Sequence, residues 1–156
     1  YLKNKISDIK GIILTGGPQC LSEQLTIESI NKNISVLLNC INIPILGICF
    51  GFQIMAASYG GKISSMSKEQ EGINKINYIK SSPLLNGLDK YFNAYQSHKD
   101  KVVEVPYNFD IVAIDNKNNI QIIKNIKAKR WGVQFHPEGL KETEIILDNF
   151  IKLCNI

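Results

Sequence analysis

The sequence lacks several features that mark common classes of protein. No apolar run is long enough to span a bilayer, so a membrane-spanning helix is not expected. No P-loop and no glycine-rich nucleotide fingerprint is present, so the chain is not expected to perform ATP-dependent chemistry by itself. The four cysteines show no CxxC spacing, which argues against a zinc site and a disulfide framework. We therefore expect no metal and no cofactor in this chain.

The beginning of the chain, YLKNKISDIK, is polar and lysine-rich and has no apolar core, so a cytoplasmic protein is expected. Hydrophobic residues make up 44% and charged residues 21%, which is ordinary usage for one globular domain over residues 1–156. The net charge is +4, with a local basic cluster at residues 124–130 (KNIKAKR). Because this cluster lacks interleaved aromatic residues, a solvated hairpin or strand edge is favoured over a nucleic-acid site.

Apolar periodicity predicts an α/β fold with an antiparallel β insertion. The expected strands of the α/β part are residues 11–14, 43–48 and 131–135, and the expected helices are 24–42, 52–59 and 142–154. Short β-like pieces separated by turns predict antiparallel pairs at residues 62–66, 73–80, 101–105, 111–115 and 120–126. Ligands of an open parallel sheet gather at the carboxyl ends of its strands. The motifs that follow the strands at 11–14, 43–48 and 131–135 should therefore converge on one edge of the sheet.

One short stretch, GICFGFQ at residues 47–53, has the pattern of a nucleophile elbow. It joins a predicted strand to a predicted helix, so Cys49 should lie on a sharp turn between them. Gly47 and Gly51 flank the cysteine two residues away on each side, where side chains would collide as the chain doubles back. The N-terminus of the helix favours the thiolate. Cys49 is therefore predicted to be a nucleophile rather than a buried structural thiol.

A second stretch, FHPE at residues 135–138, supplies an imidazole and a carboxylate. Residues two apart on a strand point the same way, so His136 and Glu138 are expected to project together, with Pro137 at the strand's end. Glu138 would then orient the imidazole. A lone cysteine or a lone HPE tripeptide is weak, whereas the combination of thiol, imidazole and carboxylate is specific.

Together with three further blocks, these motifs give a chain that resembles the class I (triad) glutamine amidotransferases over most of its length. The matching blocks are GIILTGGP, PILGICFGFQ, YGGK, SHKD and WGVQFHPE, at residues 11–18, 44–53, 59–62, 97–100 and 131–138. SHKD is most similar to the SHGD-type segment of the GMP synthetase amidotransferases. The resemblance implies a flavodoxin-like fold with an open, mostly parallel sheet and flanking helices. It also implies that an N-terminal strand and helix are missing, because this chain reaches GGP after only a short polar lead.

The resemblance implies a role for each site residue. The implied catalytic triad is Cys49, His136 and Glu138, and the implied oxyanion donors are the backbone N–H groups of Gly17 and Phe50. The residues implied to hold the amino acid end of the substrate are Gln53, Ser97, His98 and Asp100. Of these, Asp100 suits the α-ammonium, and His98 has a competing structural role. Lys99 replaces the family's usual glycine, which removes no catalytic group.

The reaction implied by the resemblance is hydrolysis of L-glutamine to glutamate and ammonia through a γ-glutamyl thioester. Because the chain has no nucleotide motif, an ATP-dependent synthetase domain or subunit, with its own ATP and Mg²⁺, should receive the ammonia for the amination of XMP to GMP. Three alternatives stay open. They are a γ-glutamyl hydrolase or peptidase-like relative, an amidotransferase for carbamoyl phosphate, anthranilate or aminodeoxychorismate, and a non-catalytic module of the same fold.

Overall fold

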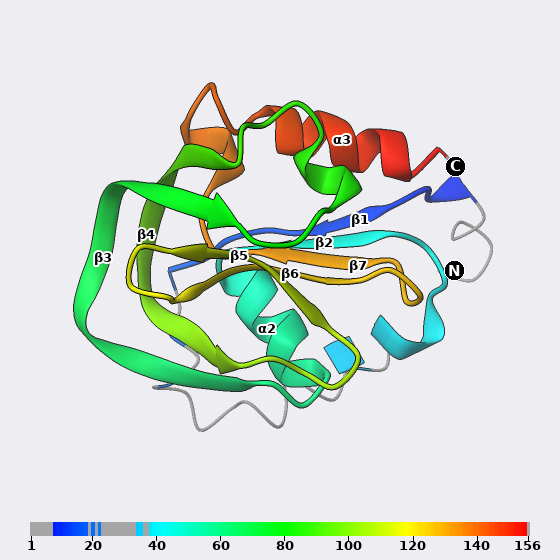
Figure 1. Ribbon diagram of the computed structural model, residues 1–156. Coiled ribbons are helices and arrows are strands. Elements are labelled where there is room, and N and C mark those ends of the chain that lie inside the picture. The colour runs from blue at the N-terminus through cyan, green and yellow to red at the C-terminus, as the bar shows by residue number, and fades with distance from the viewer. Residues whose placement is uncertain (1–7, 19, 21, 23–33, 36–37, 156) are drawn as a thin grey trace.

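The computed structural model describes residues 8–18, 20, 22, 34–35 and 38–155, which include a seven-stranded sheet (Figure 1). Its strands are β1 (Ile12–Leu14), β2 (Ile45–Ile48), β3 (Lys62–Tyr78), β4 (Tyr91–Glu104), β5 (Asp110–Asp115), β6 (Ile120–Asn125) and β7 (Arg130–Val133). They lie in the order β1-β2-β7-β6-β5-β3-β4. β1, β2 and β7 pair in parallel, and the other neighbours pair antiparallel. The predicted α/β fold with an antiparallel insertion is confirmed.

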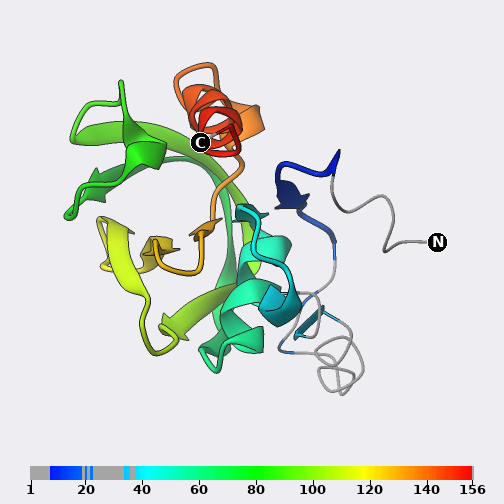
Figure 2. The same ribbon diagram turned by 90° about the vertical axis from the view of Figure 1, so that its right-hand side faces the viewer.

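Two α-helices cover opposite faces of the sheet, as Figures 1 and 2 both show. They are α2 (Phe50–Ser58) and α3 (Ile145–Leu153), and two short 3-10 helices are η3 (Pro83–Leu85) and η4 (Pro137–Gly139). Phe150 of α3 packs in one hydrophobic cluster with Trp131 and Val133 of β7. Phe52 of α2 belongs to a second cluster on the other face. None of the described helices is long and apolar enough to cross a membrane.

Helix α2 lies very close to β7, and a glycine makes this approach possible. A Cβ atom on Gly132 would lie 2.3 Å from Cδ2 of Phe52 and 2.8 Å from Cε of Met55. Successive residues on a strand point to opposite faces, so Gly132 meets α2 while its neighbours face α3. The close contact places the first turn of α2 directly over the parallel strands.

The bounds of the helices differ from the prediction. α2 begins at Phe50, two residues earlier than expected, because Cys49 already occupies its N-cap position. α3 begins at Ile145 rather than at residue 142, because the preceding residues form turns in which the Thr143 hydroxyl donates to the Pro137 carbonyl. The predicted helix at 24–42 lies mostly outside the described residues; of its described part, residues 34–35 and 38–40 are helical and residues 41–42 are not.

The antiparallel ribbon of β3 and β4 is much longer than predicted. The two expected strands at 62–66 and 73–80 form the single strand β3, and β4 begins at Tyr91 rather than at Lys101. A register shift between Ser65 and Gln70 interrupts the pairing. Most of β3 is polar and exposed or half-buried, so hydrophobic patterning cannot reveal it, and the pairing with its neighbours defines the strand.

The basic cluster at residues 124–130 is the turn between β6 and β7, and its two end residues are buried rather than solvated. Nζ of Lys124 donates to the Ser81 carbonyl. Arg130 is 2% exposed, and its Nε donates to the hydroxyl of Tyr59. The backbone carbonyls that accept from its guanidinium are those of Leu38, Ile41, Ile43, Ala128 and Lys129. Arg130 therefore fastens the segment before β2 to the start of β7.

Replacing Arg130 with methionine should destabilise the protein strongly. Methionine fills part of the volume but leaves several buried carbonyl oxygens without donors, and we expect a loss of about 3 kcal/mol of unfolding free energy. Urea denaturation followed by circular dichroism measures this loss. The control is Lys127→Met in the exposed part of the same turn, which should change stability by less than about 0.5 kcal/mol. Equal losses in the two variants would contradict the anchoring role.

Candidate active site

The elbow predicted around Cys49 is present. Cys49 lies between the end of β2 and the start of α2, with φ 50° and ψ −110°, in the region that a non-glycine residue rarely adopts. Such a conformation costs on the order of 1–3 kcal/mol and persists only where the surroundings enforce it. The Cys49 N–H donates to the Val133 carbonyl at 2.8 Å, which ties the elbow to the end of β7.

The two glycines around Cys49 are required by close packing, as predicted from their spacing. A Cβ atom on Gly51 would lie 2.1 Å from the backbone oxygen of Leu14, at the end of β1. A Cβ atom on Gly47 would lie 2.7 Å from the backbone oxygen of Gly51 and 2.8 Å from the backbone of Phe52. Any side chain at either position would push α2 away from the strands that it covers.

His136 and Glu138 lie close together, but the strand geometry predicted for them is wrong. β7 ends at Val133 rather than at Phe135, and Glu138 lies in the 3-10 helix η4. The turn begun by Pro137 brings the Glu138 Oε1 to 2.8 Å from the His136 Nδ1. The His136 N–H donates to the Tyr95 carbonyl of β4 at 2.9 Å, which fixes the backbone of the residue.

The Cys49 side chain and the His136 imidazole are hydrogen-bonded to each other. The hydrogen bond with the Cys49 side chain is the largest influence on His136 and, with a further contribution from Glu138, raises its pKa to about 9, although burial acts in the opposite direction. The imidazole is therefore a cation at neutral pH. Because Nδ1 donates to Glu138, the opposite nitrogen Nε2 is left for the sulfur. A Cβ atom on Gly16 would lie 3.0 Å from Cε1 of His136 and 3.6 Å from Cβ of Cys49, so a glycine covers the pair.

A pocket of about 460 Å³ opens over this pair. Every residue predicted for the site lines this pocket except Glu138, which contacts the ring of His136. The further lining residues are Pro18, Cys20, Glu69 and Lys99. The loops that follow β1, β2 and β7 all reach the pocket, so the predicted convergence of three motifs at the carboxyl ends of parallel strands is observed. No group of three or more metal-binding side chains occurs among the described residues.

Gly17 and Phe50, the predicted oxyanion donors, lie at the pocket beside Cys49. Gly17 follows β1, and Phe50 is the first residue of α2, so its N–H has no partner within the helix. The positive end of the α2 dipole also lies at this point.

The residues expected at the substrate's amino acid end make contacts within the protein. Gln53 is 2% exposed, and its Nε2 donates to the backbone oxygen of Asp100 at 2.9 Å and to Oε1 of Gln134 at 3.2 Å. The Asp100 carboxylate accepts from the Ser22 N–H at 2.8 Å and from the Ser22 hydroxyl. The Ser97 carbonyl accepts from the Cys49 sulfur at 3.6 Å. Gln53 and Asp100 thus also join elements around the pocket.

His98 is 6% exposed, and both of its ring nitrogens have partners. Nδ1 lies 2.7 Å from the Asp100 carbonyl, and Nε2 lies 3.0 Å from Oε1 of Gln96. Burial is the largest influence on the His98 pKa and lowers it, while the Asp100 carbonyl raises it. His98 therefore has two roles: its ring is fixed by hydrogen bonds within the protein, and the residue lines the pocket.

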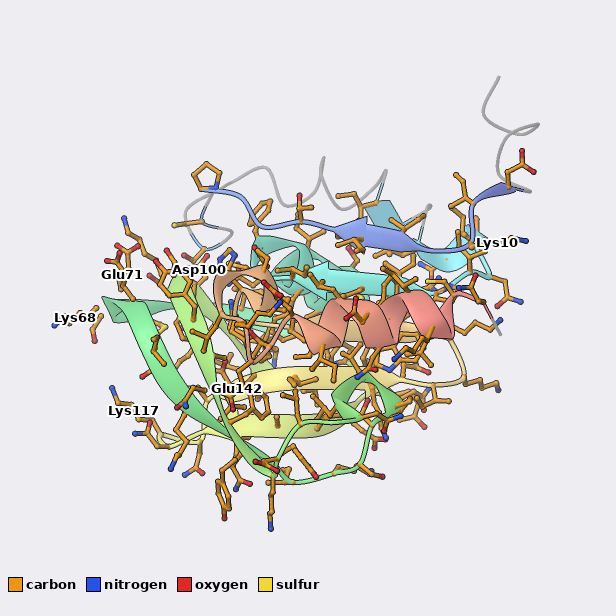
Figure 3. All side chains as sticks on the ribbon, turned by 90° about the horizontal axis from the view of Figure 1, so that it is seen from above. Lys10, Lys68, Glu71, Asp100, Lys117 and Glu142 are labelled. Atoms are coloured by element: carbon orange, nitrogen blue, oxygen red, sulfur yellow. The ribbon has the colours of Figure 1, made fainter. Side chains whose placement is uncertain are left out.

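Sequence reasoning missed Glu69, Ser22 and Gln96. Glu69 reaches the pocket at the register shift in β3, and Ser22 reaches it through Asp100. Gln96 supports His98 from β4. None of these residues carries a local sequence signal, since polar residues in an exposed ribbon or a loop are ordinary. Figure 3 shows Asp100 at the end of the molecule that carries Lys68 and Glu71, away from Lys10.

The chain is similar to subunits of GMP synthases from several archaea. A subunit of the glutamine-hydrolysing GMP synthase of Methanococcus aeolicus is 41% identical over 152 residues, covering 96% of this chain and 76% of the relative. The identically named protein from Methanocaldococcus jannaschii is 39% identical over 150 residues, covering 94% and 75%. A crystal structure of a candidate GMP synthase subunit from Thermoplasma acidophilum superposes with a TM-score of 0.83 at 26% identity, covering 97% and 76%.

The family model described as "Glutamine amidotransferase class-I" matches residues 2–153, which is nearly the whole chain. The chain therefore belongs to the class-I glutamine amidotransferase family.

Proposed function

We propose that this chain hydrolyses L-glutamine to glutamate and ammonia and passes the ammonia to a synthetase that aminates XMP to GMP. The observation that carries the proposal is the contact of Cys49 with His136, both of which line the 460 Å³ pocket. Glu138 binds the other ring nitrogen of His136. A pocket of this volume suits a small metabolite.

The first step is attack of the Cys49 sulfur on the side-chain carboxamide carbon of glutamine. His136 already carries a proton as the imidazolium, so the sulfur attacks as the thiolate, and the C=O bond opens to an oxyanion as the new S–C bond forms. Glu138 keeps Nδ1 protonated and stabilises this imidazolium. The proton on Nε2 of His136 then goes to the amide nitrogen as its bond to carbon breaks, which releases ammonia and leaves a γ-glutamyl thioester.

Water completes the cycle. His136, now neutral, removes a proton from water as it attacks the thioester carbon, and the S–C bond breaks to return the thiolate and glutamate. In both halves of the reaction negative charge develops on the carbonyl oxygen. We assign its stabilisation to the N–H groups of Gly17 and Phe50, and each such donor is typically worth about 3 kcal/mol of barrier.

The amino acid end of glutamine is assigned to the wall formed by β4. Asp100 is the acceptor for the α-ammonium, because a carboxylate has about four lone-pair sites and Ser22 occupies two of them. Ser97, His98 and Gln53 complete this wall. Through its contact with the Asp100 carbonyl, Gln53 holds the backbone of this wall.

The synthetase is proposed from the relatives, which are named as subunits of a glutamine-hydrolysing GMP synthase. Ammonia released in open water would be protonated and lost, so the site needs a partner that consumes it. We place ATP, Mg²⁺ and XMP on that partner. The partner's identity is tested by reconstitution, in which only the correct synthetase couples glutamine hydrolysis to amination.

Cys49 should react with a glutamine-like electrophile. We expect diazo-oxo-norleucine to add one equivalent to the wild-type chain in the presence of its synthetase, as seen by intact mass, and none to Cys49→Ala. Cys40→Ala is the matched control, because Cys40 is an exposed thiol outside the pocket and its loss should leave the adduct unchanged. An adduct that persists in Cys49→Ala would contradict the assigned nucleophile. Faster turnover of γ-glutamyl peptides than of glutamine would instead indicate a γ-glutamyl hydrolase.

The activity should fall as the pH rises through about 9. The folded His136 has a pKa raised from 6.5 to about 9, so the imidazolium that protonates the leaving amide nitrogen is present below that pH and lost above it. Glu138→Gln removes one raising influence, so the alkaline limb of kcat/KM should move to lower pH and kcat should fall about 100-fold or more. The control is Asp148→Asn on the exposed surface of α3, which should retain the wild-type profile. An unchanged limb in Glu138→Gln would contradict this pairing.

A further inference from the structure

A buried chain of polar side chains leads away from the pocket wall. It starts at His98 on β4, passes through Gln96 and Gln121, and ends at Asp115, the last residue of β5. The four side chains are 6%, 0%, 0% and 2% exposed, in that order. Polar groups so deeply buried need partners, because each unmatched group loses its contacts with water without replacement.

Each link of the chain is a contact between two side chains. His98 Nε2 lies 3.0 Å from Gln96 Oε1, and Gln96 Nε2 donates to Gln121 Oε1 at 2.9 Å. Gln121 Nε2 points to Asp115 Oδ2 at 3.5 Å. At the other side of the ring, His98 Nδ1 lies 2.7 Å from the Asp100 carbonyl.

Both ends of this chain can only accept hydrogen bonds. The Asp115 carboxylate already accepts from the N–H groups of Lys117 and Asn119 at 2.8 and 2.9 Å, and from Asn119 Nδ2 at 2.8 Å. An ionised carboxylate has no proton to donate, and neither has the Asp100 carbonyl. The direction of every donor between the two ends is therefore constrained.

The donor directions determine the state of the imidazole. With Asp115 as acceptor, Gln121 turns its NH₂ group toward it and its oxygen toward Gln96. Gln96 then donates its own NH₂ group to Gln121 and presents its oxygen to His98. Every contact is matched only if both nitrogens of His98 carry protons, and an imidazole with two N–H groups is a cation.

We propose that Asp115, Gln121 and Gln96 are positioning residues that hold His98 as an imidazolium at the pocket wall, where its charge attracts the α-carboxylate of the substrate. The second half of this statement rests on the proposed function, whereas the first half concerns the protein alone. The negative charge of Asp115 acts on His98 through two amide groups, which are polarised in the same direction.

The charged groups around His98 oppose and support this state. Burial is the largest influence and, with His136, lowers the pKa of His98 overall, although the Asp100 carbonyl and the carboxylates of Asp115 and Asp100 raise it. The imidazolium is favoured instead by the donor directions along the buried chain. Glu69 and Lys99 line the same pocket with opposite charges. A neutral ring requires both glutamine amides to rotate, which points the Gln121 oxygen at the Asp115 carboxylate. The cation avoids this repulsion, since each of its N–H groups meets an acceptor.

The protonation of His98 can be measured directly by nitrogen-15 NMR of the histidine rings in the full chain. The chain has only two histidines, so His98→Gln assigns both sets of signals. In the wild type at pH 7, we expect both ring nitrogens of His98 to be protonated. A neutral His98 in the wild type at that pH would overturn the proposal.

Asp115→Asn tests the remote carboxylate with almost no change of shape. The introduced asparagine can keep its oxygen on the two backbone N–H groups and offer its amide to Gln121. The Asn119 amide, which donates to the same Asp115 oxygen as Gln121, must then turn as well, and both glutamines can rotate and leave His98 neutral. The midpoint of His98 titration should fall by about one pH unit or more. Asp110→Asn, at the half-exposed start of β5, is the matched control and should leave the midpoint unchanged. Equal midpoints in wild type and Asp115→Asn would also overturn the proposal.

Two further variants keep the test decisive. If Asp115→Asn does not fold, Gln121→Leu interrupts the chain without touching the turn and should lower the midpoint similarly. In the Asp115→Asn background, Gln96→Glu moves a carboxylate next to His98 Nε2 and should restore the imidazolium. A merely structural role would not produce this recovery, so its failure would count against the proposal.

Enzyme kinetics tests whether the charge of His98 contributes to glutamine binding. With the synthetase present, Asp115→Asn should raise KM for glutamine about tenfold, with kcat changed less than about threefold, because substrate binding rather than bond breaking is affected. An unchanged KM with a neutral His98 would overturn the proposed attraction between His98 and the α-carboxylate of the substrate. Absence of glutamine turnover in the wild type would reject the proposed function alone, because the NMR result does not depend on activity.

Discussion

The backbone of Cys49 is the constraint on which the rest of the site depends. Its positive φ is maintained by the N–H contact with Val133 and by glycines that allow α2 to lie against the ends of β1 and β2. Three parallel strands thus meet at one strained residue. The strain places the sulfur at the start of a helix, beside backbone donors and within reach of an imidazole.

The two parts of the sheet contribute different walls of the pocket. The parallel strands deliver the thiol and the imidazole through the loops that follow them, and α2 contributes backbone donors. The long ribbon of β3 and β4 forms the opposite wall, where Glu69 and His98 lie. The contact between the His136 N–H and the Tyr95 carbonyl joins the two parts at His136. The contacts of Gln53 with the Asp100 backbone and of the Cys49 sulfur with the Ser97 carbonyl join the same two parts.

The elements that can be predicted well are those whose sequence signal is local. The apolar run before Cys49, the glycines around it and the helix after it define a βα unit within residues 43–59, and the structure confirms that unit. The start of β4 escapes prediction because its alternation includes buried polar residues such as Gln96 and His98. The burial of Arg130 escapes it because a basic residue in a turn is ordinarily solvated, and only distant carbonyls explain its position.

The order of residues alone specifies the chemistry of the site: a thiol bracketed by glycines, an imidazole, and a carboxylate two residues from that imidazole. Steric limits on a tight turn act between neighbouring residues, so they can be recognised in a short stretch of sequence. Folding in three dimensions sets how polar groups far apart in the chain pair. Asp100 meets Ser22 across 78 residues, and Gln96 meets Gln121 across 25. Such contacts depend on strand register and chain path, for which no local pattern exists, and they determine which charges face the substrate.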